Sequence, residues 1–203
     1  MRTAAALLTL AVVAAVRWAR RSGTTAAERS RALPGDELVP DARLALDRAT
    51  TLPAPAERVW PWLVQLGKGR GGWYLPRNLE LLVPPARRGL RRLDPRWQRL
   101  AVGDVIPDWG GPAATFEVVT LDPLRALVHR SRRPRRGGPP MEISWALVLD
   151  PLDGDRCRLQ LRLRIDRVGR RALALVAGAA DLVDGATVRP LFAGLAERVS
   201  RPS

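Results

Sequence analysis

Hydrophobic and polar residues alternate with a period of two along several stretches of the chain. In residues 157–165 every second side chain is apolar and the others are Arg or Gln, and the same period runs through Ile143, Trp145 and Leu147. This alternation is typical of antiparallel strands that place one face on a core and the other in water. It predicts strands at 141–149 and 157–165, and shorter or less regular segments predict others at 43–52, 102–106, 114–121 and 126–130.

Two of these predictions contain arginines in unusual places. In the first strand, Arg48 falls among the apolar residues of the face that should be buried. Residues 130–136, RSRRPRR, follow another predicted strand and precede Gly-Gly-Pro-Pro. Their charge and these turn-forming residues predict a hairpin loop.

A helical period replaces the alternation in two places. Val59, Trp62, Leu63 and Leu66 recur at i, i+3, i+4 and i+7, which predicts a short helix ended by the glycine-rich sequence GKGRGG. That sequence lacks both the preceding apolar strand and the spacing of a phosphate-binding loop, so we interpret it as a turn. The Ala-rich residues 170–199 predict a long C-terminal helix.

The N-terminus carries an uncharged run, residues 3–16, followed by Arg17, Arg20 and Arg21. As a helix the run is about 21 Å long, short of the roughly 30 Å hydrocarbon core, although a snorkelling Arg17 extends it. Three interpretations compete: a membrane anchor, a signal peptide and a buried helix. The arginines favour an anchor (residues 1–21) with the domain on the cytoplasmic side, and they oppose export through a signal peptide.

Three sequence blocks carry a resemblance to a known family. They are VWPWLVQLGKGRGGWY (residues 59–74), LPGDELVP (residues 33–40) and LAVGDVI (residues 100–106). They resemble the START-like superfamily, also called SRPBCC or polyketide cyclase/dehydrase and lipid transport, and within it a bacterial membrane-anchored group. The resemblance implies an α+β helix-grip fold, a curved antiparallel sheet around a long C-terminal helix. It divides the chain into the anchor, a tether and extended lead-in (residues 22–42) and a START-like domain (residues 43–200).

Charge and rare residues narrow the chemistry. The chain has 34 Lys and Arg against 20 Asp and Glu, a net charge of +14, and Lys68 is its only lysine. A coding bias toward Arg explains this as well as an acidic lipid or nucleic acid does. We expect an anionic membrane surface to meet the loop arginines Arg132, Arg133, Arg135 and Arg136, and we do not expect nucleic acid, since no aromatic residue interleaves RSRRPRR. Cys157 is the only cysteine, which excludes an internal disulfide. His129 is the only histidine, which makes a histidine-based zinc site improbable.

The helix-grip fold implies an internal cavity between the sheet and the long helix. The expected lining residues are Trp62, Trp73, Tyr74, Trp109, Trp145, Phe192, Glu80 and Asp166. We interpret His129 as a structural histidine, and no pair of carboxylates has a spacing that demands acid–base chemistry. The sequence thus predicts binding of a hydrophobic small molecule or lipid, with no cofactor or metal. The alternative is a cyclase or dehydratase acting on polyketide-like substrates.

Overall fold

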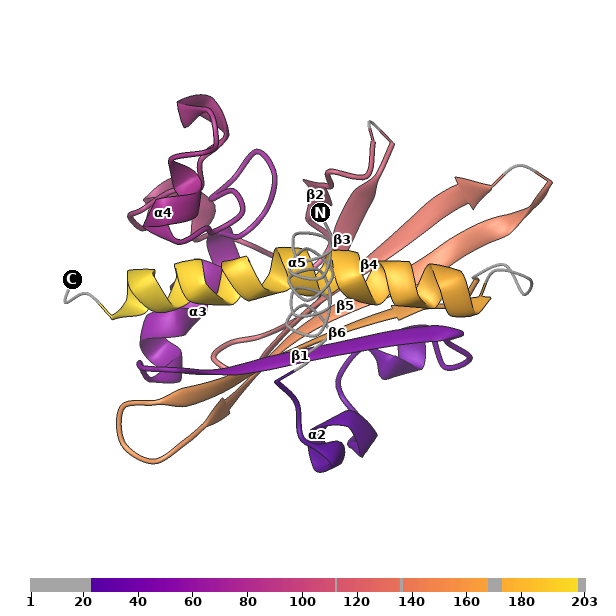
Figure 1. Cartoon of the computed structure of the whole chain (residues 1–203), viewed down its shortest axis with the longest axis horizontal. Coiled ribbons are helices and arrows are strands. Elements are labelled where there is room, and N and C mark those ends of the chain that lie inside the picture. Colours follow the sequence, from indigo (N-terminus) through magenta and orange to yellow (C-terminus); the bar gives the residue numbers. More distant parts are fainter. Residues whose placement is uncertain (1–22, 112, 136, 168–172, 201–203) are drawn as a thin grey trace, which may run out of the picture.

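The structure, a computed structural model, describes residues 23–111, 113–135, 137–167 and 173–200, with only the backbone for 173–180. Figure 1 shows the long helix α5 lying across a twisted sheet. The strands are β1 (Leu44–Leu52), β2 (Val105–Pro107), β3 (Thr115–Asp122), β4 (Ala126–Arg135), β5 (Gly138–Pro151) and β6 (Cys157–Ile165). The α-helices are α2 (Ala26–Ser30), α3 (Ala56–Gln65), α4 (Arg77–Glu80) and α5 (Leu173–Val199), and the 3-10 helices are η1 (Asp36–Leu38), η2 (Pro85–Arg87) and η3 (Pro95–Trp97).

The six strands form one antiparallel sheet in the order β1-β6-β5-β4-β3-β2. The predicted α+β architecture, a curled antiparallel sheet with a long C-terminal helix, is therefore confirmed, and it is consistent with a helix grip. No helix in the described part of the chain is long and apolar enough to cross a membrane. The expected anchor, residues 1–21, lies outside the described residues.

The inner face of the sheet carries the main core. Leu147 on β5 pairs with Leu161 on β6, and both are buried beneath Leu191 of α5 in one hydrophobic cluster. Helix α3 closes one end of this cluster with Val59 and Trp62. The period of two places these side chains inward, because successive residues of a strand point to opposite faces.

The outer face of the sheet is covered by the segment that precedes β1. Leu33 packs with Val128 and Val148 in a second apolar cluster. The buried Arg162 donates to the carbonyl oxygens of Glu28, Arg29 and Arg31 and forms an ion pair with Asp47 at 2.8 Å. The segment expected to be a tether is thus packed against the domain from its first described residues.

The prediction of a hairpin loop at residues 130–136 is wrong. Strand β4 continues through the arginines to Arg135 and pairs with β5, which begins at Gly138. Glu142 lies opposite Arg132 and forms ion pairs with both Arg130 and Arg132, at 3.0 and 2.8 Å. Opposite charges on neighbouring strands stabilise the ladder, so the basic stretch extends as a paired strand and not as a loop.

Candidate functional site

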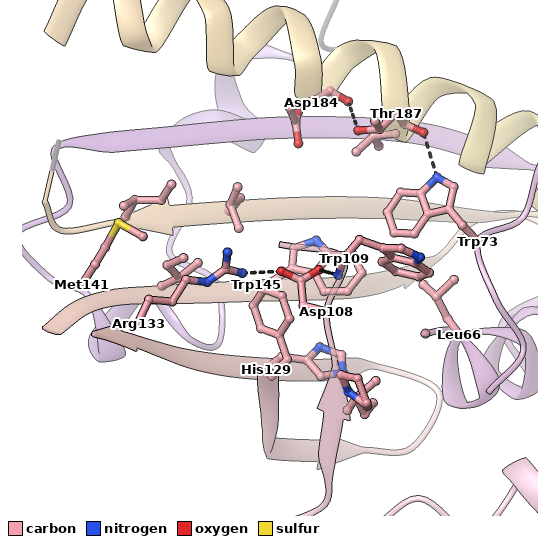
Figure 2. A pocket seen from close by; sticks show the side chains of 18 residues that line it. Leu66, Trp73, Asp108, Trp109, His129, Arg133, Met141, Trp145, Asp184 and Thr187 are labelled. Atoms are coloured by element: carbon pink, nitrogen blue, oxygen red, sulfur yellow. Dashed lines mark hydrogen bonds and ion pairs between the residues drawn. The ribbon is translucent and has the colours of Figure 1, made fainter. Parts of the chain in front are cut away.

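A cavity of about 330 Å³ lies between the inner face of the sheet and the middle of α5, at Asp184, Thr187 and Val188. Figure 2 shows side chains of α5 above it and of the strands below it. Its aromatic walls come from the turn after α3, the loop after β2, and strands β3 and β5. The Trp and Phe side chains that line it are Trp73, Trp109, Phe116 and Trp145.

The aromatic side chains form a connected set. Trp73 stacks on Trp145 with ring centroids 6.2 Å apart and meets Trp109 edge-on at 5.7 Å. The ring centroid of Phe116 lies 5.8 Å from that of Trp145. Such pairs each add about 0.5–1.5 kcal/mol beyond the area that they bury. Trp109 is 53% exposed, which places it at the rim of the cavity.

The glycine-rich turn sets the position of Trp73. Gly67 and Gly72 form a bridge at the base of the turn, with φ angles of 135° and 79° that favour glycine. Trp73 then donates from Nε1 to the carbonyl oxygen of Thr187 on α5 at 3.1 Å. Lys68 donates from Nζ to the carbonyl oxygen of Asp108 at 3.0 Å, which ties the turn to the rim. The glycine-rich turn therefore holds the Trp73 indole at the cavity.

An ion pair crosses one wall of the cavity. Arg133 points inward from β4, forms an ion pair with Asp108, and lies 5.6 Å over the ring of Phe116. Arg133 was expected at a membrane surface together with its neighbours, but strand alternation turns it to the inner face, opposite Met141. Its charge is matched by Asp108, so this wall carries no unpaired cation.

His129 lies deeper in the same wall, two residues before Ser131 on β4. The residue is 4% exposed, and its ring centroid lies 5.3 Å from that of Trp145 and 6.1 Å from that of Phe116. Burial lowers the pKa of His129 to about 4, so the ring is neutral near pH 7. Its Nδ1 atom is buried out of reach of the cavity and makes no well-aligned hydrogen bond.

Asp184 faces the cavity from α5. Its Oδ2 lies 2.9 Å from Nε of Arg48, but the two atoms are not aligned as a hydrogen bond. Arg48 also pairs with Asp181 at 2.6 Å, which explains an arginine on the inner face of β1. Burial raises the pKa of Asp184 to about 6, and Arg48 opposes this rise only in part.

Three of the eight expected lining residues meet at the cavity: Trp73, Trp109 and Trp145. Trp62 and Tyr74 lie instead in the core, where their rings meet edge-on at 5.6 Å and the Tyr74 hydroxyl donates to the Trp62 carbonyl at 2.8 Å. Phe192 lines a separate hollow of about 390 Å³ between β1 and α5.

The two expected acidic lining residues serve the scaffold. Glu80 is buried between Arg198 and Arg91, at 2.8 and 2.7 Å, and so joins α4 to the end of α5. Asp166 accepts a hydrogen bond from the backbone N–H of Glu142 at 2.9 Å, at the end of β6. Neither residue lines the cavity of Figure 2.

The expected membrane arginines do not share one surface. Arg132 and Arg135 are exposed on β4, whereas Arg133 faces the cavity. Arg136 lies outside the described residues. The role of Arg132 and Arg135 at a membrane stays a prediction.

Sequence reasoning missed four lining residues that shape the cavity: Asp108, Phe116, Arg133 and Asp184. The inward position of Arg133 had a usable signal, because Leu127, His129, Ser131 and Arg133 share the period of two. Within the described residues, no group of three His, Cys, Asp or Glu side chains is placed to hold a metal ion.

No protein-family model matches the chain, and no curated protein matches it. Similar solved structures include a protein from Mesorhizobium loti, 16% identical over 78% of this chain and 98% of that chain, with a TM-score of 0.47. Norcoclaurine synthase from Thalictrum flavum is 12% identical over 85% of this chain and 96% of that chain, also with a TM-score of 0.47. At these scores the likenesses carry no argument. The class of the protein, a helix-grip domain with an aromatic-walled cavity, rests on the strand order and cavity described above.

Proposed function

We propose that this protein binds a hydrophobic small molecule in the cavity between its sheet and α5. The proposal rests on one observation: Trp73, Trp145 and Phe116 contact one another in the wall of one cavity of about 330 Å³. Binding sites for small molecules have volumes of about 300–1,000 Å³ and apolar walls with a few placed polar groups. The partly exposed Trp109 at the rim gives such a ligand an apolar entrance.

Titration with N-phenyl-1-naphthylamine, a neutral probe that fluoresces in apolar sites, tests this proposal. Saturable binding is expected, and Trp145→Ala should weaken it because that indole touches three other lining rings. Trp97→Ala is the matched control, since Trp97 stacks under Arg70 and does not line the cavity. No saturable binding by the folded protein would refute the proposal.

Binding accounts for the cavity better than catalysis of the cyclase or dehydratase type. In general acid–base catalysis each catalytic group must reach the substrate proton that it gives or takes. His129 on β4 and Asp184 on α5 are the candidates, on opposite walls (Figure 2), but Asp184 is paired with Arg48 at 2.9 Å and Nδ1 of His129 is buried out of reach of the cavity. The proposal is therefore limited to binding.

We also propose that the chain belongs to the START-like superfamily, in its bacterial membrane-anchored group, with residues 1–21 as the anchor and the domain on the cytoplasmic side. The apolar run and the arginines that follow it support this. Fractionation of cells that produce the full chain, or a form that begins at Thr24, tests it. The full chain should sediment with membranes and the shorter form should not. A cleaved, exported product would instead support the signal peptide.

A further inference from the structure

An apolar tip projects from the molecule directly after α4. Leu81 and Leu82 are 75% and 80% exposed, the two highest values among the large hydrophobic side chains of the described residues. They begin the uncharged run LLVPPA (residues 81–86), whose other members are exposed or partly exposed. Figure 1 shows the segment around α4, in magenta, and the turn between β5 and β6, in orange, on opposite sides of α5. Contiguous exposed apolar surface marks a place of contact with a protein or a membrane.

The tip has a defined backbone because both of its ends are fastened to the domain. It follows Glu80, whose buried ion pairs join α4 to α5, and the N–H of Val83 donates to the carbonyl oxygen of Glu80 at 3.1 Å. Arg88 donates from Nε to the carbonyl oxygen of Val83 at 2.8 Å. Beyond the tip, the N–H of Leu90 donates to the carbonyl oxygen of Gly71 at 2.8 Å. The leucines are thus displayed by a hydrogen-bonded segment.

The segment that carries the tip has an excess of positive charge. Residues 77–99 contain seven arginines and two acidic residues, Glu80 and Asp94. Both acids are already in ion pairs, Glu80 with two arginines and Asp94 with Arg96. The other arginines of this segment are exposed and form no ion pair with the described part of the chain: Arg77, Arg87, Arg88, Arg92 and Arg99. Their charge is therefore available to an anionic partner.

An apolar tip followed by two arginines matches the layers of a bilayer that contains anionic lipid. Leucines gain by leaving water for the acyl region, and arginines gain near anionic head groups. A run of six residues is far shorter than the about 20 of a spanning helix, so it fits shallow insertion. It is also smaller than the about 20–30 residues that each partner contributes to a stable protein–protein interface. These features favour a membrane over a protein.

We infer that residues 81–88 dock on an anionic membrane surface, with Leu81 and Leu82 inserted among the lipids and Arg87 and Arg88 at the head groups. This contact is separate from the small-molecule cavity and does not require the N-terminal anchor. It also lies on a different segment from the exposed arginines of β4.

The environment-sensitive fluorophore NBD, attached at residue 82 of the full chain, tests the inference. Leu82→Cys supplies the attachment point, and the native Cys157 is fully buried, so it does not compete for the label in the folded protein. Emission should shift to shorter wavelength with vesicles of phosphatidylcholine and phosphatidylglycerol, and less with phosphatidylcholine alone. High salt should reduce this difference, because it screens the arginines. Leu152→Cys, in the exposed turn between β5 and β6, is the matched control and should show little shift.

Further substitutions in the labelled Leu82→Cys chain separate the two parts of the contact. With the anionic vesicles, Arg87→Ser should lower the ratio of inserted to free label about fivefold, and Arg87→Lys should preserve it. Arg156→Ser is the control, because it removes an exposed arginine from the turn between β5 and β6. Leu81→Ser should lower the ratio about tenfold, because the leucine no longer leaves water. All of these side chains are exposed, so the fold should be kept.

Two kinds of result would overturn the inference. The first is no shift at residue 82 with the anionic vesicles, or an equal shift at residue 152. The second is a shift that appears without vesicles and grows with protein concentration, which would assign the leucines to a contact between two copies of the chain. Neither result bears on probe binding in the cavity or on fractionation of the form that begins at Thr24, so the earlier proposals are tested separately.

Discussion

Replacing Arg48 by Met should destabilise the protein in a manner that depends on pH. The side chain of Arg48 is 3% exposed and faces Asp181 and Asp184, whose side chains are 27% and 16% exposed. Removing one partner of a buried ion pair costs about 3–5 kcal/mol, mainly because the other charge stays buried without compensation. Partial hydration of Asp181 favours the lower end, so we expect a loss of about 3 kcal/mol near neutral pH.

The pKa of Asp184 gives this loss its pH dependence. In the wild-type protein burial raises that pKa to about 6, and loss of Arg48 should raise it further. A raised pKa in the folded state means that stability is greatest below the unfolded value and is lost as pH rises through the folded value. The deficit of Arg48→Met relative to the wild type should therefore be largest at about pH 7.5 and should roughly halve at about pH 5, where Asp184 is protonated.

Urea unfolding at these two pH values measures the effect, and Arg48→Met/Asp184→Asn is the matched control. The double variant removes the buried carboxylate, so it should recover more than half of the lost stability and lose most of the pH dependence. A deficit that is the same at both pH values, or a double variant no more stable than Arg48→Met, would show that the ion pair does not set the stability of this contact.

Three shorter predictions concern the core, the cavity and the surface. Trp62→Ala should cost about 3–5 kcal/mol in urea unfolding, as for a packed core, whereas Trp145→Ala should cost less and weaken probe binding; equal costs would contradict the assignment of Trp145 to a cavity wall. Because folding lowers the pKa of His129 to about 4, its contribution to stability is complete above about pH 6.5 and is lost toward pH 4, up to about 3 kcal/mol. His129→Phe should lack this loss in urea unfolding at pH 7 and pH 4.5, and an unchanged pH profile would contradict the lowered pKa. Replacing Arg132 and Arg135 by Ser should weaken sedimentation with anionic liposomes at low salt; binding that is unchanged, or insensitive to salt, would refute a membrane role for these residues.

The sequence predicted the parts of the fold that depend on local periodicity. The alternation of residues 157–165 predicted where β6 lies and which of its side chains face the core. The glycines after α3 predicted the turn that precedes Trp73. These signals lie within a few residues of each other. The inward direction of Trp145 followed from the same period of two.

Partners distant in the sequence could not be predicted in this way. Arg48 looked like a flaw in β1 because its partners, Asp181 and Asp184, lie more than a hundred residues away. The arginines of β4 looked like a loop because their cross-strand partner Glu142 lies beyond the turn. Trp62 was expected to line the cavity of the helix-grip fold, although its helical stripe with Val59 already pointed to the core.

The division between packed core and cavity runs along the strands themselves. On β5, Leu147 is fully buried against the second half of α5, whereas Ile143 and Trp145 line the cavity near Asp184. The packed half includes Trp62 and most of the large buried leucines, so it supplies most of the hydrophobic stabilisation. The cavity half is less completely packed, so it contributes less of this stabilisation. A ligand that fills the cavity would stabilise the folded state by an amount that grows with the logarithm of its concentration relative to its Kd, and it would do so in the half where packing is incomplete.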